Sequence, residues 1–207
     1  MLVMYVIMRF WQQYKITIIA LLPLIVILVG MLLPSNVIIP VANATRHDWN
    51  HQTFWNNRWG RSGVHKGIDI FAHLNQPVIS ASPGIVIYTG QRLLGGNTVA
   101  ILGPKWRIHY YAHLKEIKTG FLSFVSQKEV IGTVGRTGNA RKKPPHLHYS
   151  ILSLVPYPWR WDNSKQGWKK SFFLNPTTQL LPKNRIKLAR KQPSRNNTGN
   201  KLAKNVY

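Results

Sequence analysis

The sequence predicts a mainly β domain, with antiparallel sheets in a compact sandwich or barrel-like unit, preceded by one hydrophobic helix. Strand-forming Val, Ile, Tyr, Trp and Thr dominate the middle of the chain, and Gly, Pro and Asn recur between the apolar runs as turns. Short strands joined in this way favour antiparallel pairing. The third observation is an apolar run near the N-terminus, which predicts the helix.

The N-terminal run extends from Ile16 to Leu33 without a charge, about 18 residues, which is near the minimum for a helix that spans a bilayer. Arg9 and Lys15 precede the run, and this asymmetry predicts that the rest of the chain lies outside the cytoplasm. Ala42-Asn43-Ala44 has the small-x-small pattern of a signal-peptidase site. We therefore expect residues 1–44 to be a signal peptide or an N-terminal membrane anchor, and the sequence leaves both open.

Three segments follow the N-terminal one. Residues 45–58 form a polar and aromatic connector, 59–182 the β domain, and 183–207 a basic tail with too few apolar residues to order itself. Within the β domain the expected hairpin-like pair is 77–81 with 85–88, around the Pro83-Gly84 turn. Further strands are expected at 98–102, 106–113, 130–135 and 146–151, with no amphipathic helix between Trp59 and Tyr157.

Composition limits the function classes. The chain of 207 residues has 28 Lys and Arg against five Asp and Glu, a net charge of +23, which indicates a polyanionic partner. For an exported chain we expect anionic envelope polymers or lipids, with the membrane contacted through the N-terminal segment if it is kept, rather than nucleic acid. The chain has no cysteine, which excludes disulfides, zinc ribbons and thiol nucleophiles. Any metal must be held by His, Asp or Glu.

Two distant patterns together predict a metal site. His146 and His148 flank an apolar residue on an expected strand, so both imidazoles point to one face while Leu147 points into the core. Upstream, His65 and Asp69 add another imidazole and a carboxylate. Three of these four groups would fill a tetrahedral zinc site and leave its last position to water.

The spacing of His65 and Asp69 requires a bend. Four residues of straight strand span roughly 13 Å, whereas zinc–ligand bonds are about 2.0–2.2 Å. Gly67 lies midway and is free to adopt the positive φ that such a bend can need. Ile68 and Ile70 flank Asp69 and are expected to form a hydrophobic floor beneath it.

Another strand carries Tyr111 and His113, which alternation places on one face, opposite Ala112 and Leu114. A half-buried structural histidine is the alternative interpretation of His113. Structural or surface roles are expected for the histidines outside these motifs, namely His47, His51, His73 and His109.

These motifs occur in an order that resembles the lysostaphin-type (LytM-type) zinc endopeptidases of peptidoglycan. The order is H-x-G-x-D from His65, then Tyr111-Ala112-His113-Leu114, then a glycine-rich turn and His146-Leu147-His148. Further similar segments are Pro77-Val78, Pro83-Gly84-Ile85-Val86, Gly96-Asn97-Thr98-Val99 and Gly135-Arg136-Thr137-Gly138-Asn139-Ala140. The resemblance covers about residues 59–151.

The resemblance assigns His65, Asp69 and His148 as ligands of one Zn²⁺ per chain, and His113 and His146 as catalytic histidines that do not bind the metal. Zinc would lower the pKa of a water molecule to about 7 and polarise the scissile carbonyl. The H-E-x-x-H motif is absent, so histidine takes over proton transfer, and either of the two can be the base.

The function that the resemblance implies is hydrolysis of peptide stems or cross-links of peptidoglycan by an exported or anchored enzyme of the periplasm or cell envelope. One alternative is a non-hydrolytic domain of the same fold that regulates another cell-wall hydrolase. Another is a basic envelope-binding or nucleic-acid-binding protein with incidental histidines. Candidate substrate contacts are the basic residues Arg136 and 141–143, which are alternatively ordinary solvent-facing charges. Three tryptophans are candidates as well, and the alternative for them is packing at the sheet edge: Trp159, Trp161 and Trp168.

Overall fold

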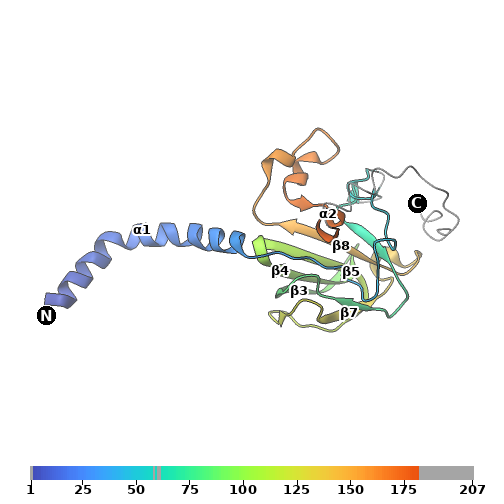
Figure 1. The fold of residues 1–207 in the computed structure, drawn as a ribbon, viewed down its shortest axis with the longest axis horizontal. Coiled ribbons are helices and arrows are strands. Elements are labelled where there is room, and N and C mark those ends of the chain that lie inside the picture. The colour runs from blue at the N-terminus through green and yellow to red at the C-terminus, as the bar shows by residue number, and fades with distance from the viewer. Residues whose placement is uncertain (1, 58, 60–61, 182–207) are drawn as a thin grey trace.

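The computed structural model describes residues 2–57, 59 and 62–181. Helix α1 (Leu2–Leu32) extends away from the domain as a single arm (Figure 1). The strands form one nine-stranded sheet in which neighbours pair antiparallel. The predicted mainly β class with an N-terminal helix is therefore confirmed. The expected tail at 183–207 lies outside the described residues.

The sheet has the order β1-β8-β5-β4-β3-β6, with β7 joined to β5, β2 joined to β7, and β9 joined to β8. The strands are β1 (Ile68–Phe71), β2 (Pro77–Ile79), β3 (Gly84–Arg92), β4 (Gly96–Gly103), β5 (Arg107–Ile117), β6 (Phe124–Val125), β7 (Val130–Val134), β8 (His146–Ser153) and β9 (Phe173–Leu174). Short helical segments are the 3-10 turns η2 (Pro104–Trp106), η3 (Gly138–Ala140), η4 (Pro158–Arg160) and η5 (Gly167–Ser171), and the α-helix α2 (Pro176–Leu180). As expected, no α-helix occurs among the described residues between 62 and 157.

Alternation in β1 and β8 separates the core from the opposite face of the sheet. Ile68 and Ile70 in β1, and Leu147, Tyr149 and Ile151 in β8, are all completely buried in one hydrophobic cluster. Because side chains alternate along a strand, Asp69, His146 and His148 point to the other face. The predicted hydrophobic floor beneath Asp69 is thus present.

Strand β5 pairs with different neighbours along its length. Its first part, up to Ala112, pairs with β8, and its last part, from Leu114, pairs with β7. The expected hairpin of 77–81 with 85–88 is wrong, because β2 pairs with β7 while β3 pairs with β4 and β6. Alternation determines which face of a strand is buried but not which strand lies beside it.

Helix α1 is bent by 71° between its pieces Val3–Lys15 and Ile19–Leu32. Among the described residues no single helix meets the length and hydropathy expected of a membrane span, whereas these two pieces taken together do.

Candidate metal centre

Neighbouring strands bring Asp69 and His148 together. In the antiparallel pairing of β1 with β8, Asp69 is the direct partner of His148, and Ile68 is the partner of Tyr149. Directly opposite side chains on one face of such a pair lie about 4.5–5.5 Å apart at Cβ. The register of the sheet therefore places a carboxylate beside an imidazole without any contribution from loops.

His65 reaches the same point from the segment that precedes β1. Its side chain is 1% exposed, and its ring stacks on Trp59 with 3.9 Å between ring centroids. Gly67 permits this approach for a reason that differs from the expected one, because its φ is not positive. A Cβ at Gly67 would instead collide with the Tyr149 carbonyl oxygen and the Ser150 hydroxyl. The chain can bend close to β8 at this point because Gly67 has no side chain.

Three donor atoms converge at this point, which we call the His–Asp–His trio (His65, Asp69 and His148). Asp69 Oδ1 lies 2.8 Å from His148 Nδ1 and 3.2 Å from His65 Nε2, and the two nitrogens are 3.1 Å apart. Ligand atoms around a tetrahedral zinc with bonds of about 2.1 Å are roughly 3.4 Å apart. The triangle needs to open by only a few tenths of an ångström, so the trio fits zinc.

The remaining ring nitrogens of the trio are held by residues that sequence reasoning missed. His65 Nδ1 lies 3.2 Å from the Thr53 carbonyl oxygen, and His148 Nε2 lies 3.0 Å from Ser150 Oγ. A carbonyl oxygen only accepts, so Nδ1 of His65 donates to it, and loss of the Nε2 proton on metal binding would leave a lone pair for the ion. Ser150 follows His148 by two strand positions, and this spacing could have revealed it, whereas no sequence pattern indicated Thr53.

The Asp69 carboxylate gives the centre of the trio a negative charge. Burial by itself would raise the pKa of Asp69, but the hydrogen bonds to His148 and His65 outweigh it and hold the pKa well below the usual carboxyl value. Asp69 is thus a carboxylate at neutral pH. One buried negative charge facing two imidazole nitrogens is a donor set suited to a divalent cation.

His113 and His146 form a second group, which we call the histidine pair. Their ring centroids are 5.0 Å apart, and each Nδ1 hydrogen bonds to a backbone carbonyl oxygen, at Thr137 (2.9 Å) and at Pro144 (2.8 Å). Each Nδ1 therefore donates, and each Nε2 keeps its lone pair. Burial is the main cause that lowers the pKa of His113 to about 3 and also lowers the pKa of His146, so both rings are neutral at pH 7.

His113 faces the trio only because β5 is irregular there. Tyr111 and Leu114 are completely buried in the core, while Ala112 and His113 both line the cleft, so the expectation that Tyr111 and His113 share a face is wrong. The backbone of His113 has φ +63°, and the β4–β5 register shifts at this point. A β-bulge of this kind puts two consecutive side chains out of alternation, and it turns the imidazole away from the core.

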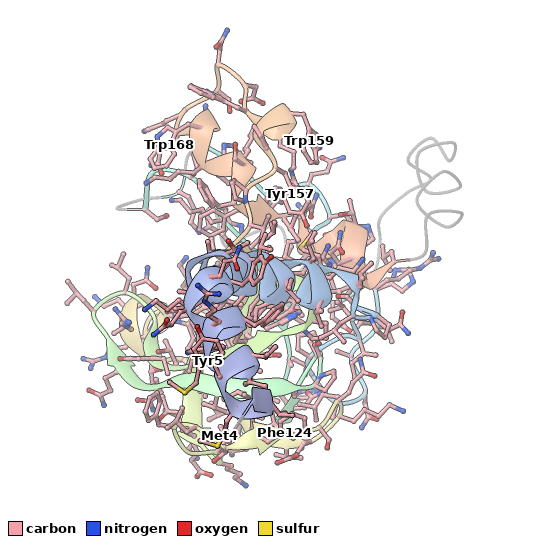
Figure 2. The ribbon with its side chains drawn as sticks, turned by 90° about the vertical axis from the view of Figure 1, so that its left-hand side faces the viewer. Met4, Tyr5, Phe124, Tyr157, Trp159 and Trp168 are labelled. Atoms are coloured by element: carbon pink, nitrogen blue, oxygen red, sulfur yellow. The ribbon has the colours of Figure 1, made fainter. Side chains whose placement is uncertain are left out.

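A cleft of about 350 Å³ contains both groups, and Trp59, Lys143 and Phe173 also line it. Of the basic residues expected to contact substrate, Lys143 is the one that lines the cleft. Trp159, Trp161 and Trp168 do not line it and are 78%, 66% and 53% exposed. Figure 2 shows Trp159 and Trp168 on the segment that projects beyond the sheet after β8.

The other histidines lie apart from the cleft. His47 and His73 are exposed, and His51 is partly buried with a hydrogen bond to the Arg46 carbonyl oxygen. His109 is completely buried on the core face of β5, where its Nδ1 lies 2.7 Å from the Tyr149 hydroxyl.

Comparisons with known proteins agree with this geometry. Residues 63–157 match Peptidase family M23. The chain is 38% identical over 132 residues to an L-Ala–D-Glu endopeptidase of Bacillus subtilis, covering 55% of this chain and 40% of that protein. It is 37% identical over 95 residues to the peptidoglycan DD-endopeptidase ShyC of Vibrio cholerae, covering 45% of this chain and 21% of that protein. In both cases the chain spans well under two thirds of the relative's length.

The fold has a solved counterpart in the catalytic domain of a prophage-encoded M23 protein from Enterococcus faecalis. The TM-score is 0.52 at 18% identity, over 70% of this chain and 98% of that domain. At this identity the likeness concerns the fold alone. Together with the sequence match, the motif order and the sheet register, it shows that residues 63–157 of this chain form a lysostaphin-type domain of peptidase family M23.

Proposed function

We propose that this domain is a zinc-dependent endopeptidase that hydrolyses peptide bonds in the stems or cross-links of peptidoglycan, with one zinc ion per chain. The observation that carries the proposal is the convergence of three donor atoms in a cleft that also receives two neutral imidazoles. The relatives named as endopeptidases, one of them a peptidoglycan endopeptidase, support the class of substrate.

In this proposal the trio binds the metal through His65 Nε2, Asp69 Oδ1 and His148 Nδ1. The Thr53 carbonyl and the Ser150 hydroxyl fix the two rings through their other nitrogens, as partners beyond the ligands commonly do. When bound, zinc would polarise the scissile carbonyl and lower the pKa of a water molecule at its open position.

Hydrolysis adds the oxygen of water to the carbonyl carbon and returns a proton to the leaving nitrogen, so the site needs a proton acceptor and a proton donor. The histidine pair supplies both, because each ring holds its Nδ1 proton on a backbone carbonyl and presents Nε2 as an acceptor. The ring that has taken the proton of water becomes the donor to the nitrogen, and the other is positioned to hydrogen bond to the substrate. The described acidic residues that line this cleft consist of Asp69 alone, which leaves proton transfer to histidine.

The proposal favours an enzyme over a non-hydrolytic regulator of the same fold, because all five positions of the trio and the pair are filled and oriented. We also place the domain outside the cytoplasm, at the cell envelope. The N-terminal apolar run behind Arg9 and Lys15, the net charge of +23 and the proposed substrate all support that location.

The test is metal analysis and wall digestion with the purified full chain. About one zinc per chain is expected by mass spectrometry of the metal, together with release of soluble fragments from purified peptidoglycan. Hydrolysis should stop with a chelator and return on addition of zinc. The masses of the released fragments would identify the bond, whether a D-alanyl cross-link, another stem bond or a glycine bridge.

Two outcomes would contradict the proposal. Stoichiometric zinc without hydrolysis of any wall preparation would support the regulatory alternative. A metal-free protein that binds DNA with strong salt dependence would support the basic binding protein.

A further inference from the structure

The segment 37–44, which we call the entry strap, is packed into the peptidase domain. Val41 is 2% exposed and belongs to the same hydrophobic cluster as Val78 of β2. Val37, Ile39 and Ala44 pack against that cluster from the same segment. The strap thus contributes apolar side chains to the core although it precedes the region that matches the family.

Backbone hydrogen bonds join the strap to the outer edge of β2. The Ala42 amide donates to the Pro77 carbonyl and the Ile79 amide donates to the Pro40 carbonyl, each at 3.0 Å, around the bridge between Val41 and Val78. The Ile38 amide donates to the Ala81 carbonyl at 3.1 Å. Strand β2 pairs with β7 on its other side, so without the strap its outer edge would have unpaired amides and carbonyls.

The chain before the strap is also fixed to the domain. Trp106 Nε1 donates to the Ile27 carbonyl of α1 at 3.0 Å, and a Cβ at Gly30 would collide with the Trp106 indole. Arg107 reaches Ser35 Oγ at 3.3 Å. Trp106 has φ +54°, a left-handed backbone that a bulky residue rarely adopts, so the turn that carries the indole to α1 is held in an uncommon conformation.

Over most of its length, helix α1 packs against no other part of the chain that the structure describes. Most of its described large apolar side chains between Val3 and Leu32 are 41–84% exposed, Met31 is partly buried, and the run from Ile16 to Leu33 has no charge. An exposed apolar surface of this kind marks a membrane or protein interaction site. The two pieces of α1 together have the length and hydropathy of a membrane span, and the positive residues Arg9 and Lys15 before the uncharged run fit a lipid bilayer.

We propose that residues 1–44 are kept in the working protein, with α1 inserted in a lipid bilayer and the entry strap serving as part of the peptidase domain. Cleavage after Ala44 would remove Val41 from the core and expose the β2 edge. The small-x-small pattern at Ala42 and Ala44 then reflects the packing of the strap rather than processing. This inference concerns the covalent state and location of the chain and does not depend on the proposed hydrolysis.

A cysteine pair tests both parts of the proposal at once, because the chain has no cysteine of its own. Val41 and Val78 face each other as a non-hydrogen-bonded antiparallel pair, for which Cα atoms lie about 4.5 Å apart, within the range of a disulfide. The full chain with Val41→Cys and Val78→Cys, carrying a C-terminal tag, is expressed in a bacterium, oxidised and analysed by intact mass and peptide mapping.

The expected result is a chain that still contains residues 1–44, with the two introduced thiols joined, and that stays in the membrane fraction after washes with high salt and alkaline carbonate. A mature N-terminus at Thr45 with a free thiol at position 78 would overturn the proposal. Release of the intact chain by the salt wash would overturn the bilayer as the partner of α1.

The control pair is Asn36→Cys with Val78→Cys. Asn36 is exposed, and it lies immediately before the strap, five residues ahead of Val41 in the bridge. This pair should remain reduced under the same oxidation while the mass of the chain is unchanged. Equal closure of both pairs would show that the strap is not seated on β2. Zinc content and wall hydrolysis measured on the same samples report the proposed function separately.

Discussion

The His–Asp–His trio and the histidine pair share one cleft but are held in different ways. The trio has a carboxylate with a strongly lowered pKa at its centre, and its donor atoms lie within 3.2 Å of one another. In the pair, the rings are 5.0 Å apart, neutral, and tied to backbone carbonyls through Nδ1. The difference shows how one residue type can serve two purposes. In the proposed mechanism the imidazoles around the carboxylate would hold a cation, and the imidazoles held neutral by burial would exchange protons.

Removing a member of the trio should have the largest effect. For Asp69→Ala or His65→Ala we expect loss of bound zinc and of all measurable peptidoglycan hydrolysis, because two remaining donors do not make a stable zinc site. Zinc content and fragment release would be measured on the same preparation. Normal zinc content in the Asp69→Ala protein would contradict the assignment of the trio.

Removing a member of the pair should separate catalysis from metal binding. His113→Ala is expected to keep its zinc and to lose about 10²- to 10⁴-fold in turnover, the usual contribution of a positioned acid or base. The matched measurement is kcat on a defined wall peptide, with zinc content as the internal control. Full turnover in this variant would remove His113 from the mechanism.

Loosening the trio without removing a ligand should have a smaller effect. Ser150→Ala deletes the hydroxyl at 3.0 Å from His148 Nε2 and leaves all three donors in place. Loss of such a partner lowers metal affinity by about 10- to 100-fold. Competition with a chromogenic zinc chelator would measure this change, and an unchanged affinity would show that the register of β1 and β8 alone orients His148.

A fifth histidine, His109, extends the comparison to the core face of β5. Burial lowers the pKa of His109 to about 3, whereas an unfolded chain takes up this proton near pH 6.5. Between these values the unfolded state binds more protons, so His109 makes the free energy of unfolding fall as the pH falls. The loss from this group between pH 7.5 and pH 5 is about 2 kcal/mol.

Urea unfolding at the two pH values, in detergent, would measure that loss. His109→Gln should show a pH-dependent decrease smaller by about 2 kcal/mol, and the exposed His73→Gln should behave like the parent chain. An identical pH dependence in the His109→Gln protein would contradict the neutral buried state.

Deleting residues 183–207, which lie outside the described residues, should have the smallest effect on the cleft. Cleavage of a small soluble peptide should be unchanged, because the deletion removes no residue of the trio or of the pair. Binding to intact walls should weaken at low salt, since the deleted segment is rich in Lys and Arg. A pull-down with wall fragments at two salt concentrations would measure it, and unchanged binding would leave the tail without a role there.

Local patterns were sufficient where a strand is regular. The H-x-H spacing predicts that His146 and His148 share a face above Leu147, and Ile68 and Ile70 beneath Asp69 follow the same rule. The prediction from alternation was wrong at His113, because a β-bulge with positive φ moves its side chain to the other face of β5. The bulge coincides with a shift in the pairing of β5 with β4, which the sequence of β5 alone does not reveal. The pairing of β2 with β7 also escaped prediction, since partner choice depends on contacts between distant segments.

The sequence alone determined the residue types of the site, the regular strands and the uncharged N-terminal run, because these depend on local spacing and composition. The tertiary structure decided that Gly67 avoids a collision rather than adopting a positive φ, and that Thr53 and Ser150 orient the two imidazoles of the trio. It also decided that the strap before Thr45 belongs to the core. These features arise from close packing between segments far apart in the chain, which no local pattern encodes.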